Sequence, residues 1–383
     1  MLKRRILTAD VVYSGLGTAR DGGAVVVQDD GTERKVVLID SLDVAQQNFP
    51  DDPVEHVGFA ISPPLVNAHT HLDLTRMPYT PGTYEDFIRA VLRHSPQRQN
   101  EGLAAAEEGL QQLRNHQVNV VGDIVTSEAV MKRLLTDPTL QGVAYWEVLG
   151  PNPDDAEKIF NETVDTLRKF RAWERPGGVR LGLSPHTPHT VSGPLLQQLA
   201  RLARGSRLPL QIHIAESAGE VALHRDGTGP LMELMRDFLP GWQPSGLSPV
   251  QYLAQLGVLE AEPTLVHMVY VDDDDVRTVQ QANCAVVHCP RSNEALGSGR
   301  FVWELFAKHG VSVGIGTDSS GSSPSLAPQA EVASALRQHG TRSSPLALVR
   351  AAVKGGYRAL GLKPPQVRRG DPASRLVVWQ PLD

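Results

Sequence analysis

The chain has 383 residues, of which 41% are hydrophobic and 21% charged, a composition typical of globular proteins and not of disordered or collagen-like chains. The formal net charge is −6 and no basic stripe occurs, so we expect no nucleic-acid partner. Two cysteines exclude a disulfide framework, and no apolar run approaches the ~18 residues of a membrane helix, so we expect a cytoplasmic protein without a membrane partner.

The first 60 residues are predicted to form a small β structure. Short β-branched runs alternate there with turns rich in glycine and aspartate, which is typical of antiparallel strands. Residues 370–379 return to strand character and could pair with the N-terminal strands. We therefore predict a small β-sandwich domain built from both chain termini, residues 1–60 and 365–383.

From residue 61 onward, apolar strand-like runs alternate with amphipathic helical segments. The helical segments, such as residues 101–116, 154–174 and 193–205, carry apolar residues at helical spacing. Eight strands, each followed by a helix, over about 250 residues are the pattern of a (β/α)8 TIM barrel, which we predict for residues 61–364. The eight predicted strands cover residues 65–71, 118–125, 142–149, 179–186, 209–216, 264–271, 284–290 and 311–318.

The first predicted strand of the barrel ends in His69-Thr70-His71. Active sites of TIM barrels lie at the carboxyl ends of the strands. Alternate residues of a strand point to the same side, so both imidazoles can face the barrel mouth, close enough to share one metal ion. Two histidines at this spacing also arise by chance, so the pair alone is weak evidence for a metal site.

Further acid–base side chains lie at the ends of three other predicted strands, and the joint pattern indicates a metal-dependent enzyme. Imidazole nitrogens with one carboxylate suit zinc or iron(II). Such an ion lowers the pKa of a bound water from 15.7 to about 7, and a carboxylate that is not a ligand can then carry the proton. Glu216 follows His213 by three residues, just past the strand end, which suits that role. The residues at these three strand ends are His213, Glu216, His267 and Asp318.

The motifs HTHLDL, HIAES, LVH, VVHCPRSN and GIGTD occur in this order, and together they resemble the amidohydrolase superfamily. In particular they resemble its mononuclear branch of cytosine-deaminase-like and chlorohydrolase-like enzymes. The resemblance implies that Glu216 is the general acid/base and that His267 polarises the substrate or holds the hydroxide beside Asp318. The metal ligands that it implies are His69, His71, His213 and Asp318.

One departure from the binuclear members of the superfamily bears on the number of metal ions. Those members bridge two metals with a carboxylated lysine near the end of the third or fourth strand. Here the two strand ends read YWEVLGP and LSPHTPH, without lysine. We therefore expect one divalent ion, Zn²⁺, with Fe²⁺ as the alternative.

The chain also resembles the 6-aminodeoxyfutalosine deaminases of the futalosine route to menaquinone, which act on an adenine nucleoside bearing a benzoate. This resemblance implies that His186 lies against the substrate, and that His189 replaces a residue that is often aromatic in relatives. Arg291 and Asn293 follow a predicted strand and could line the pocket. Arg76 and Arg89 are further candidates to bind the benzoate carboxylate.

Several alternatives remain open for the function. Adenosine, methylthioadenosine or S-adenosylhomocysteine could be the deaminated substrate, and a triazine-type chlorohydrolase uses the same constellation. From another class, a non-catalytic scaffold could keep the barrel without the chemistry, but the chain retains all six positions of the site. We expect a small-molecule substrate and, as the resemblance implies, a homodimer.

Overall fold

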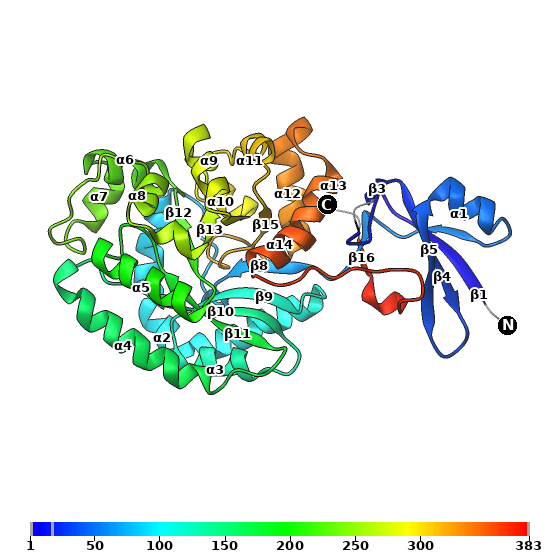
Figure 1. The fold of residues 1–383 in the computed structure, drawn as a ribbon, viewed down its shortest axis with the longest axis horizontal. Helices are drawn as coiled ribbons and strands as arrows, with labels where there is room; N and C mark the ends of the chain where they lie inside the picture. The colour runs from blue at the N-terminus through cyan, green and yellow to red at the C-terminus, as the bar shows by residue number, and fades with distance from the viewer. Residues whose placement is uncertain (1–2, 17–18, 381–383) are drawn as a thin grey trace.

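The computed structural model describes residues 3–16 and 19–380. β structure from the two ends of the chain lies at one end of the molecule, and parallel strands surrounded by helices make up the larger remainder (Figure 1). In the described part of the chain, no helix combines the length and the apolar character needed to cross a membrane.

Eight parallel strands form the predicted barrel. They pair in chain order within two four-stranded sheets, β8 to β11 and β12 to β15. Two bridges complete the ring: Leu183 pairs with Leu210, and Thr70 pairs with Asp318. The strands are β8 (Val66–Thr70), β9 (Val120–Val125), β10 (Gln141–Val148), β11 (Val179–Pro185), β12 (Gln211–Ile214), β13 (Thr264–His267), β14 (Ala285–His288) and β15 (Val313–Ile315).

Helices surround the strands, and several of them begin at a residue whose side chain accepts a hydrogen bond from the first turn. The longest, α2, starts well before the predicted position because the Thr83 hydroxyl accepts the Asp86 N–H and opens the helix there. The helices of the barrel are α2 (Tyr84–Asn115), α3 (Glu128–Thr136), α4 (Ala156–Arg171), α5 (Gly193–Ser206), α6 (Ala218–Asp226), α7 (Pro230–Met235), α8 (Pro249–Gln255), α9 (Asp273–Gln281), α10 (Pro290–Ala295), α11 (Trp303–His309), α12 (Pro328–His339), α13 (Pro345–Arg350) and α14 (Gly356–Ala359).

A second apolar cluster, separate from the main core, covers the side of the barrel where the strands end. Met77 and Phe87, from the segment after β8, pack there with Leu223 of α6 and Leu231 of α7. These residues lie in segments that follow the carboxyl ends of strands, the end of a barrel where active sites are expected.

The β structure outside the barrel consists of two four-stranded sheets, of order β5-β4-β1-β6 and β16-β7-β2-β3. Val12, Val25 and Ile61 form a common core between them, and β16 from the C-terminal segment pairs with β7. Most pairs are antiparallel, as expected, but β1–β6 and β2–β7 are parallel. The division into domains at residues 60 and 365 stays a prediction. The elements are β1 (Lys3–Thr8), β2 (Val11–Tyr13), β3 (Ala19–Asp21), β4 (Gly23–Asp29), β5 (Arg34–Ser41), α1 (Leu42–Asn48), β6 (Val54–His56), β7 (Ala60–Ser62) and β16 (Val377–Trp379).

Candidate active site

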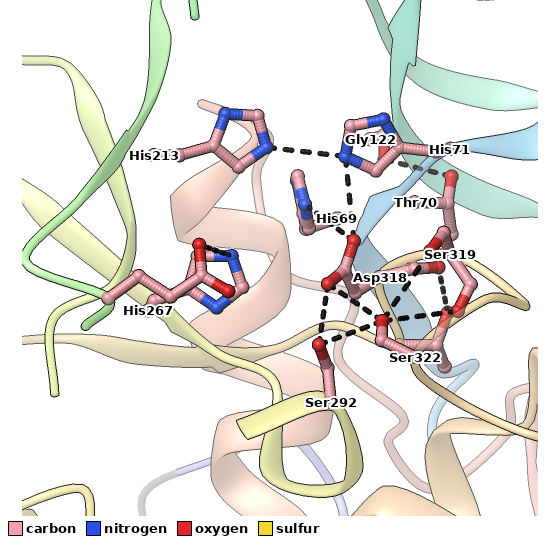
Figure 2. Close-up of polar contacts among 12 residues, drawn as sticks. His69, Thr70, His71, Gly122, His213, His267, Ser292, Asp318, Ser319 and Ser322 are labelled. Carbon is pink, nitrogen blue, oxygen red and sulfur yellow. Dashed lines mark hydrogen bonds and ion pairs between the residues drawn. The ribbon is translucent and has the colours of Figure 1, made fainter. Parts of the chain in front are cut away.

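The four side chains predicted as metal ligands meet at the carboxyl ends of three strands (Figure 2). His69 lies in β8 and His71 directly after it, His213 lies in β12, and Asp318 follows β15. The Nε2 atoms of His71 and His213 are 3.2 Å apart. Asp318 Oδ1 lies 3.5 Å from His71 Nε2 and 3.6 Å from His69 Nε2. All four side chains are buried.

Hydrogen bonds around this cluster orient two of the rings toward its centre. His69 Nδ1 donates to the Gln211 side-chain oxygen at 2.7 Å, and His213 Nδ1 donates to the His186 carbonyl oxygen at 2.9 Å. Each ring therefore carries its proton on Nδ1 and directs an Nε2 lone pair inward. His69 Nε2 is buried and has no hydrogen-bond partner among the described residues.

The measured separations fit a divalent ion. Ligand atoms around a tetrahedral zinc ion at ~2.1 Å lie roughly 3.4 Å apart, and the three distances given above fall close to that value. Burial, together with the neighbouring imidazoles, lowers the pKa of His71 and of His213 well below the usual value, so both rings are neutral. Neutral imidazoles beside a carboxylate form a ligand set that zinc accepts.

Asp318 is held in place by serines that sequence reasoning missed. Its Oδ2 accepts hydrogen bonds from Ser292 Oγ at 2.6 Å and Ser322 Oγ at 3.1 Å. The backbone of Asp318 has a φ of +61°, a strained conformation that is common at functional sites. Burial acts to raise the pKa of Asp318, but the contacts with His69 and the neighbouring histidines outweigh it and hold the pKa well below its usual value.

A glycine allows β15 to approach β8 closely enough to deliver Asp318. A Cβ atom at Gly316 would lie 2.8 Å from the Cβ of His69, so any other residue at this position would displace His69. The backbone N–H of Asp318 donates to the His69 carbonyl at 3.0 Å. The first and last strands of the barrel, β8 and β15, therefore lie close together at the site itself.

Glu216 and His267 face this cluster from the other side. Glu216 Oε2 lies 3.5 Å from His267 Nε2. Burial, with the nearby Asp318 and Glu220 carboxylates, raises the pKa of Glu216 well above its usual value. Burial also lowers the pKa of His267 to about 4. The site therefore contains two carboxyl groups with opposite shifts, as expected for a metal ligand and a proton carrier.

Asn293 determines the tautomer of His267. The Asn293 side-chain oxygen can only accept, so the His267 Nδ1 at 2.9 Å is the donor and Nε2 faces Glu216 as a lone pair. The Asn293 amide nitrogen in turn lies 3.3 Å from His288 Nδ1. Sequence reasoning placed Asn293 after a strand but gave it no such role.

The predicted substrate residues differ in position. The His186 ring packs against that of His213, with centroids 5.1 Å apart, so it lies at the edge of the cluster.

The predicted arginines have partners within the chain. Arg291 donates to Ser325 Oγ at 2.9 Å and lies beside Glu331 of α12. Arg76 pairs with two glutamates of α2, and Arg89 pairs with Asp86. Each of these three arginines already has a partner within the chain, and the role of Arg291 in substrate binding stays a prediction.

Two other side chains near the cluster were missed because neither stands in a recognised motif. Tyr84, the first residue of α2, is buried, and burial and the charges of Glu216 and Glu220 raise its pKa well above the usual value. Arg98, also on α2, donates to Asp73 Oδ1 at 2.8 Å, and its Nε is buried without a partner. The charge of Arg98 contributes to the low pKa of His71 and of His186.

Comparisons with known proteins identify the family of the chain. Residues 60–381 match the model of the amidohydrolase family. The chain is 43% identical to an aminodeoxyfutalosine deaminase of Deinococcus radiodurans over 98% of its own length and 90% of that protein. It is 27% identical to a 5-methylthioadenosine/S-adenosylhomocysteine deaminase of Haloarcula marismortui over 80% of its length and 69% of that protein.

A solved structure shares the fold. The Helicobacter pylori aminofutalosine deaminase, solved in complex with methylthio-coformycin, superposes with a TM-score of 0.73 at 20% identity, covering 96% of this chain and 90% of that one. The family match covers most of the chain, and it includes every side chain of the cluster described above. The chain belongs to the amidohydrolase family.

Proposed function

We propose that this protein is a metal-dependent hydrolytic deaminase of an adenine nucleoside derivative, with 6-aminodeoxyfutalosine as its substrate in the route to menaquinone. The observation that carries the proposal is the buried cluster of three histidines and Asp318, with the Glu216 carboxyl group facing it. The similarity to the Deinococcus radiodurans enzyme over nearly the whole chain supports the choice of substrate.

The metal is proposed to be zinc, held by His69, His71, His213 and Asp318, because neutral imidazoles with one carboxylate are ligands that zinc prefers. When bound, such an ion makes water a stronger nucleophile at neutral pH. Iron(II) accepts the same ligands and remains the alternative.

Glu216 is proposed to move the protons of the reaction. In the net reaction, one water adds at the ring carbon that carries the amino group, the carbon–nitrogen bond breaks, and ammonia leaves a carbonyl behind. Glu216 takes one proton from the attacking water and delivers it to the adjacent ring nitrogen. The second proton of the water passes to the amino group, which then leaves as ammonia. Burial raises the pKa of Glu216, so its carboxylate is a stronger base than that of an exposed glutamate.

His267 is proposed to orient the attacking oxygen. Its Nδ1 proton is engaged by Asn293, so Nε2 can accept a hydrogen bond from a group lying between it and Glu216. The low pKa of His267 keeps this ring neutral, and therefore able to accept, across the physiological range.

Arg98 is proposed to bind the carboxylate of the substrate. Of the arginines considered, it is the one that is buried near the cluster, and Asp73 occupies only part of its guanidinium group. A guanidinium group presents several donors in one plane and matches a carboxylate well. Arg98→Met should raise KM for 6-aminodeoxyfutalosine strongly and KM for the uncharged methylthioadenosine weakly, in steady-state assays of both.

The experiment that tests the proposal is an assay of ammonia release with purified, zinc-loaded protein. The substrates are 6-aminodeoxyfutalosine, methylthioadenosine, S-adenosylhomocysteine and adenosine. The proposal predicts the highest kcat/KM for 6-aminodeoxyfutalosine. Preference for methylthioadenosine or S-adenosylhomocysteine, the substrates in the name of the Haloarcula marismortui relative, would replace the proposed substrate and keep the reaction.

A further inference from the structure

A second cluster of metal-ligating side chains lies behind Glu216. His189 follows β11, while Glu220 and His224 stand one turn apart on α6, where residues at this spacing share a face. The three side chains are 2%, 1% and 0% exposed. Neither the sequence motifs nor the proposed reaction gives these residues a role.

Several polar atoms of this cluster have no partner. Both ring nitrogens of His224 and Oε1 of Glu220 are buried without a hydrogen bond to any described residue. Buried polar groups are nearly always satisfied, and those that are not point to a bound ion or water. The His224 ring is enclosed by the rings of Trp242 and Tyr252, each with its centroid 5.1 Å away.

The three side chains of this cluster lie close enough together to share one ion. One ligand atom from each of His189, Glu220 and His224 lies within 4.8 Å of the others, the same limit that His69, His71 and His213 meet. His189 Nδ1 is 3.2 Å from Thr187 Oγ1, which leaves Nε2 for a ligand. Two imidazoles and one glutamate form a ligand set known from zinc enzymes, with the fourth position left for a water.

We propose that His189, Glu220 and His224 bind a second divalent transition-metal ion of the zinc type. This ion is separate from the one in the active site, and the inference does not rest on the proposed reaction. Glu220 contributes Oε1 to the ion, while its Oε2 accepts the backbone N–H of Glu216 at 2.9 Å.

The second ion supports the segment that carries the proton carrier. Ala215, directly before Glu216, has a φ of +52°, a conformation that costs energy in a residue with a side chain. Glu220 holds this turn through the N–H of Glu216, and an ion that fixes Glu220 fixes the turn with it. The role of the second ion is therefore to position Glu216.

Metal stoichiometry tests the proposal. The full-length protein and its variants are saturated with Zn²⁺, freed of excess ion by gel filtration, and analysed by inductively coupled plasma mass spectrometry. We expect two zinc ions per chain in the unmodified protein and one in His224→Gln. We also expect one in His69→Ala/His213→Ala, which removes two ligands of the active site, and none when the three substitutions are combined.

Controls separate loss of a ligand from loss of the fold. Glu220→Gln removes the carboxylate ligand with little change in volume and should also lose one ion. His116→Gln, at the end of α2 and outside both clusters, should keep two. Added Zn²⁺ should raise the Tm of His69→Ala/His213→Ala, but should leave that of the combined variant unchanged.

One result would overturn the second site without touching the first. A single ion in the unmodified protein, still present in His224→Gln and Glu220→Gln and lost in His69→Ala/His213→Ala, means that the second cluster binds no metal. The same pattern leaves the proposed deaminase intact.

Discussion

The active site has two sides that differ in how they treat a buried carboxyl group. On the side of Asp318, three histidines and two serines surround the carboxylate and hold its pKa well below the usual value. On the side of Glu216, burial dominates and raises the pKa. Both residues lie at strand ends of one barrel, so the difference comes from their neighbours and not from the fold. We infer that one side binds a cation and the other exchanges a proton.

Removing the charge of Asp318 should have the largest effect. In Asp318→Asn the cluster loses its only carboxylate ligand, so we expect loss of the ion that it holds and deamination at background rates. Metal analysis and ammonia release on the same preparation check this. Unchanged metal content with unchanged turnover would show that the histidine side does not depend on Asp318.

Glu216→Gln should change the side of the site that exchanges a proton and leave the side that binds the cation unchanged. The amide cannot carry the proton, but it leaves the imidazole cluster intact. We expect kcat to fall about 10²–10⁴-fold with little change in KM and with the active-site metal retained. Near-normal kcat would remove Glu216 from the proposed proton transfer.

Two adjacent residues on α10 provide a matched pair for the same comparison. Ser292 donates to Asp318, so Ser292→Ala should weaken metal affinity by about 10–100-fold, measured by competition with a chelator. Asn293 orients His267, so Asn293→Leu should lower kcat about tenfold or more at unchanged metal content. Asn293→Asp keeps the acceptor oxygen and should restore part of kcat. If Ser292→Ala and Asn293→Leu change metal affinity and kcat to the same extent, the two sides of the site do not have separate functions.

The smallest expected effect concerns another buried carboxyl group, Glu331, which lies outside the cluster. Burial raises the pKa of Glu331 from 4.5 to about 8, although it accepts the N–H of Arg291 and the hydroxyl of Ser323. Between these two values the folded state holds a proton that the unfolded state releases, so this group lowers stability as the pH rises from 4.5 to 8.

Glu331→Gln should therefore flatten the decline of the free energy of unfolding over this range, measured by urea denaturation at several pH values. The control is Glu304→Gln on α11, a carboxyl group whose pKa the Arg300 side chain lowers to about 2, so it stays ionised in the folded state throughout this range. An equal decline in the unmodified protein and in Glu331→Gln would show that the carboxyl group is ionised in the folded state.

The sequence predicted the barrel and the residues that meet at its mouth, because strand ends are recognisable and parallel strands gather those ends on one side. It could not predict the partners of these residues. Ser292 and Ser322 reach Asp318 from segments that only the folded chain brings together. Gln211 lies on the same strand as His213, yet its bond to His69 joins residues 142 positions apart.

The pocket residues show the same limit. Arg291 was predicted from its place after a strand. Its partners Glu331 and Ser325 lie on other segments, and no local sequence pattern predicts that these segments approach Arg291. Arg98 lies within a long helix, where its spacing indicates only an exposed face, and its burial depends on the pairing with Asp73. Whether an arginine can bind a substrate depends on its charge partners in other elements, and these partners are known only from the tertiary structure.

Anomalous diffraction at the zinc absorption edge, on crystals of the zinc-loaded protein, locates the ion. We predict a peak at ~2.0–2.3 Å from Nε2 of His69, His71 and His213 and from a carboxylate oxygen of Asp318, with Glu216 outside coordination distance. The absence of a peak among these four residues, or a peak bound by Glu216 in place of Asp318, would contradict this prediction.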